Sequence, residues 1–111
     1  MSDLTASWED FSKFDFRVGK VIKAERIPGM KKILKAKIDV GGGRTVQTIV
    51  GGAEYYEPEY FVGRSVILLL NLKPKKIAGV ESQGMLLAAD IDGKPIWLTV
   101  DGEVKAGTKV R

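Results

Sequence analysis

The chain has 111 residues and a formal net charge of +4, and it contains no cysteine and no histidine. This length favours a single domain with one core, and the 44% apolar and 29% charged residues are typical of a soluble globular protein. The missing side chains exclude disulfides, Ser-His triads and His-bound zinc, so we expect a protein that is not an enzyme and needs no metal or other cofactor. No apolar run approaches the roughly 20 residues that cross a bilayer, so we expect a cytoplasmic protein without membrane contact.

The first predicted element is a short helix that begins at Ser7. Ser7 and Asp10 have the spacing of a capping box. Aromatic residues follow at near-helical intervals and give this helix one apolar face, which either pins it to the domain or forms a subunit interface. These residues are Trp8, Phe11 and Phe14.

Three predicted strands follow. The segment "FRVGKVIKAERI" is rich in Val and Ile, "ILKAKIDV" alternates strictly, and "RTVQTIVGG" follows a glycine turn. Because alternate residues of a strand face opposite sides, Leu34 and Ala36 point inward while Lys35 and Lys37 point outward together. The pattern predicts a three-stranded meander.

A second short helix and two more strands complete the predicted core. Pro58 suits the first turn of a helix and Gly63 its end. The continuous apolar run in "RSVILLLNL" indicates a strand buried on both faces, and "GMLLAADI" is the next predicted strand. Three strands, a helix and two strands are the order of the OB-fold, an all-β, five-stranded Greek-key barrel that binds oligonucleotides on its face and flanking loops.

The last 20 residues predict a further hairpin around Asp101-Gly102. Trp97 makes this extension strongly apolar, so we expect it to pack on the barrel or, as we favour, on a second subunit. The single domain, residues 1–111, would then have three parts: an N-terminal helix (7–14), a barrel (15–91) and a C-terminal β extension (92–111).

Basic residues concentrate in two segments. Seven of them lie between residues 20 and 37, against one acid, and the long segment 71–84 holds three lysines. In an OB-fold both segments border the binding face, so we expect them to converge and attract a polyanion. A solvated surface without a partner is the alternative.

The second basic segment carries a recognisable motif. "NLKPKKIAGVESQGM" resembles the signature of the tRNA-binding domain family, found at the C-terminus of many methionyl-tRNA synthetases, in the phenylalanyl-tRNA synthetase beta subunit, in EMAP-like cytokine domains and as free-standing proteins. The resemblance runs from about Phe11 to Val110, although "IPGMKK" replaces the His-Pro and Asp that many relatives have before the second strand.

The resemblance implies an OB-fold that recognises the outer corner of tRNA by shape and backbone, with little regard for the amino acid. Met85 would lie against a base, and the lysines would attract phosphates. Matched by position, the implied tRNA-binding residues are Lys32, Asn71, Lys73, Ser82, Gln83 and Met85, with Lys75 and Arg44 as weaker candidates.

The resemblance also suggests partners. Free-standing members are homodimers whose N-terminal helix and C-terminal strands form the interface, which would place Trp8, Phe11 and Trp97 there. Such a protein would act as an accessory or beta-subunit-like partner of methionyl-tRNA synthetase. The rival interpretation is a CsaA-type, export-related chaperone that binds unfolded peptides in the same groove.

Overall fold

The computed structural model describes residues 4–111. Within this range it contains two short helices and ten strands: α1 (Trp8–Ser12), β1 (Phe16–Arg26), β2 (Ile33–Asp39), β3 (Thr45–Gly51), α2 (Pro58–Phe61), β4 (Ser65–Leu69), β5 (Lys75–Ile77), β6 (Val80–Ser82), β7 (Met85–Leu86), β8 (Ala88–Ile91), β9 (Lys94–Trp97) and β10 (Lys109–Val110).

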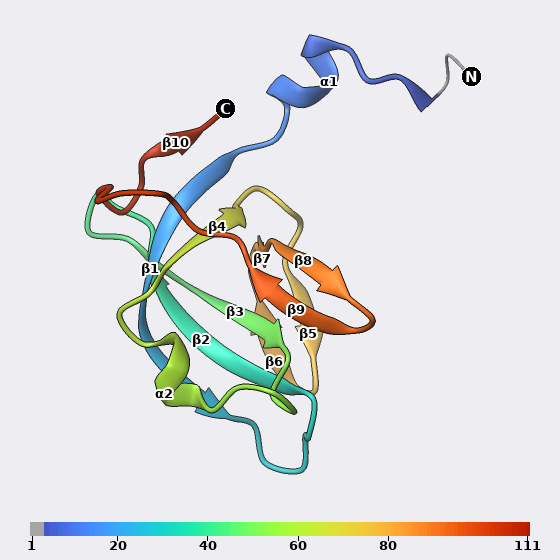
Figure 1. The fold of residues 1–111 in the computed structure, drawn as a ribbon, viewed down its shortest axis with the longest axis vertical. Coiled ribbons are helices and arrows are strands. Elements are labelled where there is room, and N and C mark those ends of the chain that lie inside the picture. The colour runs from blue at the N-terminus through green and yellow to red at the C-terminus, as the bar shows by residue number, and fades with distance from the viewer. Residues whose placement is uncertain (1–3) are drawn as a thin grey trace.

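The predicted fold class is confirmed. Five antiparallel strands in the order β3-β2-β1-β4-β7 form a nearly closed, OB-like barrel, and β10 adds to the beginning of β1 (Figure 1). The strands β1, β2 and β3 are the predicted meander. Both predicted helices are present, and Ser7 and Asp10 close the expected capping box at the start of α1.

The core follows the predicted alternation. Leu34, Ala36 and Ile38 of β2 are buried, and the residues between them face outward. All five residues from Val66 to Leu70 are buried, as the unbroken apolar run indicated. Phe61 of α2 is 1% exposed and packs in the same cluster.

Two predictions about the C-terminal third are wrong. The fifth strand breaks after Leu86, so β7 stays in the barrel while β8 leaves it and pairs with β9 (Figure 1). The turn of that hairpin is Asp92-Gly93, with φ of 49° and 89°, and not Asp101-Gly102. Both central residues have the positive φ that a tight hairpin turn requires.

Among the described residues, no helix is long and apolar enough to cross a membrane. In the same range, no three His, Cys, Asp or Glu side chains gather closely enough to hold a metal ion.

Candidate nucleic-acid interface

The basic segment between β4 and β7 is an ordered hairpin, β5–β6, fixed against β3. The hydroxyl oxygen of Ser82 accepts a hydrogen bond from the backbone N–H of Ile49 at 2.9 Å. The N–H of Gln83 donates to the carbonyl of Gln47 at 2.8 Å, and the hydroxyl of Thr48 donates to the carbonyl of Gln83 at 2.6 Å. These bonds attach the predicted binding segment to the barrel wall.

A groove of about 590 Å³ lies between this hairpin and β3. Its lining combines apolar side chains from the hairpin, β3 and β7 with two lysines, Lys73 and Lys75. Four of the residues predicted from the sequence, Lys73, Lys75, Ser82 and Met85, therefore line one groove. The apolar side chains are Ile49, Leu72, Ile77 and Met85.

Gly84 sets the position of Met85 at the edge of the groove. Its φ is +78°, and a Cβ at this position would lie 2.9 Å from the carbonyl oxygen of Leu69. A larger residue would force the chain away from β4, because both the backbone conformation and the contact exclude a side chain. Met85 pairs with Leu69 and leaves 47% of its surface exposed.

The outer face of the sheet continues from the groove across β3. Lys35 pairs with Ile49, which lines the groove, and Lys37 pairs with Gln47. The two basic segments of the sequence therefore lie next to β3 on its two sides, with β2 on one side and the β5–β6 hairpin on the other. Glu25 neutralises part of this face, since its carboxylate lies 3.4 Å from the ammonium of Lys35.

Two further predicted residues lie outside the groove lining. Lys32 is exposed just before β2, and its carbonyl accepts a hydrogen bond from the N–H of Ala53. Arg44 lies in the turn between β2 and β3, in a separate depression that also contains Lys105.

Asn71 uses its side chain within the protein. Its amide oxygen accepts a hydrogen bond from the N–H of Asp15 at 2.8 Å, and its amide nitrogen donates to the carbonyl of Lys13 at 2.7 Å. The residue thus ties the segment after α1 to the end of β4. Sequence reasoning named Asn71 but missed Ile49, Leu72 and Ile77, although Leu72 and Ile77 stand out as apolar residues among lysines.

The three residues predicted at a subunit interface lie in different environments. Trp8 is 71% exposed on α1, which extends away from the barrel (Figure 1), and its ring lies 5.5 Å from that of the half-buried Phe11. Trp97 packs edge-on against the buried Phe61, with ring centroids 5.5 Å apart. Trp97 therefore packs against the hydrophobic core of its own chain.

Known proteins resemble this chain in sequence and in structure. A family model described as a putative tRNA binding domain matches residues 16–109. The chain is 53% identical over 103 residues to the methionine–tRNA ligase of Methanocella arvoryzae and 48% identical over 102 residues to that of Thermotoga maritima. The match covers 93% and 92% of this chain but only 15% and 16% of those ligases.

Two solved structures cover nearly the whole chain. A MetRS related protein from Pyrococcus horikoshii has a TM-score of 0.89 at 40% identity, over 96% of this chain and 98% of that one. The chaperone CsaA from Bacillus anthracis has a TM-score of 0.86 at 30% identity, over 96% of this chain and 99% of that one.

Proposed function

Because this chain belongs to the tRNA-binding domain family, we propose that it binds tRNA through the groove and the adjoining outer face of the sheet. The observation that carries the proposal is the continuity of the two surfaces. The lysine-bearing hairpin and the lysines of β2 lie on either side of β3, so one RNA backbone can contact both.

The chemistry of these residues suits recognition by shape. Lysine is a point charge that attracts phosphate without reading sequence, and apolar side chains pack on bases that leave the stack. Lys32, Lys73 and Lys75 would contact phosphates, and Met85 would contact an exposed base at the outer corner of tRNA. Ser82 would instead hold the β5–β6 hairpin against β3, and Asn71 would hold the end of β4 against the segment after α1. The side chain of Gln83 is a further candidate contact.

We further propose that the chain acts as a homodimeric accessory to a methionyl-tRNA synthetase in the cytoplasm. The relatives that carry this domain are methionine–tRNA ligases, of which it forms about one-sixth. In this role the chain would contribute affinity for tRNA to the ligase reaction.

Peptide binding is the second candidate function. The lining of the groove is mainly apolar, with Leu72 and Met85 38% and 47% exposed, and CsaA proteins share the whole fold. An extended segment of an unfolded protein could place apolar side chains in such a groove. Peptide held this way would depend little on salt, whereas tRNA held by lysines depends on it strongly.

Neighbouring lysines of β5 provide a matched test. Lys75 lines the groove, whereas Lys76, the next residue of the strand, does not. We expect Lys75→Gln to weaken binding of several unrelated tRNAs equally and to flatten the salt dependence by roughly 0.7 to 0.9 in logarithmic slope, the value for one phosphate contact. Lys76→Gln should change the tRNA affinity and the salt slope much less.

The outcomes separate the two candidate functions. Loss confined to one tRNA species would contradict recognition by shape, and equal effects of the two variants would contradict the groove as the site. Salt-independent binding of an unfolded secretory precursor, together with no retention of tRNA, would favour the peptide function.

A further inference from the structure

A second row of cations follows the C-terminal tail over another part of the surface. Three adjoining depressions of about 410, 410 and 480 Å³ lie along residues 97–108. The first and second share Ser65 and Gly102, and the second and third share Lys105. We call this series of three neighbouring depressions the tail channel.

Besides Arg17, which is paired with Asp15, four basic side chains follow one another along the tail channel. Arg64 lies in the first depression, Lys20 and Lys105 in the second, and Arg44 in the third. Within residues 4–111, no carboxylate lies within 4.0 Å of any of these four, whereas other cations such as Arg26 and Lys109 form ion pairs. Their charges are therefore available to a ligand.

Acidic groups are also present along the channel. Glu103 lies in the second depression, and Asp15 lies in the third, where Arg17 and Lys109 already neutralise it. Of the two carboxylates that line the channel, only Glu103 has no ion pair within residues 4–111, so the four cations outnumber it.

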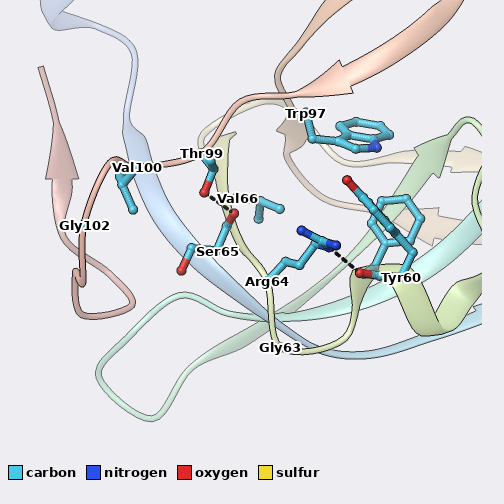
Figure 2. A pocket seen from close by; sticks show the side chains of 10 residues that line it. Tyr60, Gly63, Arg64, Ser65, Val66, Trp97, Thr99, Val100 and Gly102 are labelled. Atoms are coloured by element: carbon cyan, nitrogen blue, oxygen red, sulfur yellow. Dashed lines mark hydrogen bonds between the residues drawn. The ribbon is translucent and has the colours of Figure 1, made fainter.

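The walls of the tail channel are fixed. The guanidinium of Arg64 lies 3.8 Å from the ring centre of Tyr60, and its Nε donates to the carbonyl of Tyr60, which holds the side chain against α2 (Figure 2). The hydroxyl of Thr99 donates to the carbonyl of Ser65 at 2.8 Å, which fastens the tail to β4 (Figure 2).

A glycine contact fastens the far end. The N–H of Gly107 donates to the carbonyl of Val18 at 2.7 Å. A Cβ on Gly107 would lie 2.7 Å from the carbonyl oxygen of Val40, so the tail and the turn before Arg44 touch backbone to backbone. This contact sets Arg44 beside the tail.

The arrangement identifies the class of ligand. A small anion is held by groups that converge on one point, but each depression here holds only one or two of the four cations, and they follow one another along the tail. A row of separate charges matches a chain of phosphates. We propose that the tail channel binds the sugar-phosphate backbone of an RNA strand, as a contact separate from the groove. The proposal rests on the proposed function, since it assumes that RNA is the ligand.

A charge-removing variant tests the tail channel. We expect Lys20→Gln/Lys105→Gln to lower the logarithmic salt slope for unfractionated tRNA by about 1.4 to 1.8, because two phosphate contacts are lost. The decrease should add to that of Lys75→Gln. Lys94→Gln on β9, a lysine outside the tail channel and the groove, should leave the slope unchanged.

The salt slopes of the variants separate the tail channel from the groove. If Lys75→Gln flattens the slope and the double variant does not, the tail channel is overturned and the proposed function stands. If neither variant changes it, both proposals fail. Loss of poly-glutamate binding without loss of tRNA binding would show a site for acidic protein and would also overturn the RNA contact.

The single variant Arg44→Gln covers the case in which the double variant fails to fold. Arg44 lies in an exposed turn, and its side chain makes no hydrogen bond within residues 4–111. It should lower the slope by roughly 0.7 to 0.9 in a folded protein. An unchanged slope in this variant would likewise contradict the proposal.

Discussion

Asn71 joins two distant segments through a single side-chain amide. Replacing it with alanine removes the acceptor for Asp15 and the donor to Lys13. We expect Asn71→Ala to lower the free energy of unfolding by about 1 kcal/mol, because exposed hydrogen bonds contribute modestly. Chemical denaturation measures this change, and tRNA affinity per folded molecule should be nearly unaltered. Unchanged stability with lost tRNA binding would show instead that the amide contacts RNA.

Met85 is the residue at which a core role and a binding role can be separated. Since 47% of its surface is exposed, we expect Met85→Ala to change the free energy of unfolding by no more than about 0.5 kcal/mol. It should weaken tRNA binding about fivefold, because an apolar contact worth about 1 kcal/mol is lost. Met85→Leu, which keeps the apolar surface, should bind almost normally. Unfolding of the alanine variant would contradict this assignment.

At the scale of elements, the β5–β6 hairpin depends on its attachment to β3. In Ser82→Ala the N–H of Ile49 loses its acceptor in a partly buried position, which we expect to cost about 1 to 2 kcal/mol of stability. The hairpin should loosen, so tRNA affinity should fall although every lysine is present. Faster hydrogen exchange at the Gln83 amide, which donates to the carbonyl of Gln47 and is not changed by the substitution itself, would report the loosening. Normal exchange together with weaker binding would point to direct contact by the hydroxyl.

The long, regular elements of the fold could be predicted from the sequence because their patterns are local. The alternation along residues 34–40 predicted which side of that strand faces inward, and the apolar run 66–70 predicted a strand that is buried on both faces. The β5–β6 hairpin gave no such signal. Each strand has three residues, and its turn places Ala78 at a φ of 52°, a conformation usually marked by Asn or Gly. The break after Leu86 likewise depends on the partner strands.

The candidate site could be predicted in part for the same reason. The motif named four residues that line one groove, Lys73, Lys75, Ser82 and Met85, because these residues lie along one chain segment. It did not distinguish residues that line the groove from residues that hold it in place. Asn71 is polar and exposed, as a binding residue would be. Its structural role is shown only by its hydrogen bonds to Asp15 and Lys13, which lie 56 and 58 positions away in the sequence.

At the scale of the whole molecule, Asp15 connects the beginning of β1 to the C-terminal strand. Its carboxylate lies 2.6 Å from Nε of Arg17 and 3.1 Å from Nζ of Lys109. Burial raises the pKa of Asp15, but the hydrogen bonds and charges of Arg17 and Lys109 outweigh it, so the pKa falls below its ordinary value of 3.8. A lowered pKa contributes stability that is complete above the unfolded value and is lost as the pH falls through the folded one.

The Asp15→Asn variant should therefore show a specific pH profile. We expect it to be less stable than the original protein by a constant amount above about pH 5, and the difference to shrink as the pH falls below 3.8. Denaturation curves of both proteins between pH 6 and 2 measure this difference. A difference that stays constant over the whole range would mean that the carboxylate charge is not its source.

Exposed apolar surface at the N-terminus bears on the proposed homodimer. The helix α1 has five residues, none of them buried, and a helix this short is not stable without packing. Ile96 of β9 and Leu98, which directly follows β9, flank Trp97 and are 40% and 43% exposed. A second copy of the chain that covers these surfaces would stabilise both.

The two tryptophans should therefore respond differently to substitution. We expect Trp8→Ala to raise the dimer dissociation constant at least about tenfold, measured by sedimentation, because its large exposed ring would be an interface anchor. Trp97→Ala should instead lower the free energy of unfolding by about 3 kcal/mol, because Phe61 and Tyr56 lose their packing partner. If Trp8→Ala leaves the mass unchanged at all concentrations, the dimer does not use α1, and the exposed face of β9 is then the surface to change next.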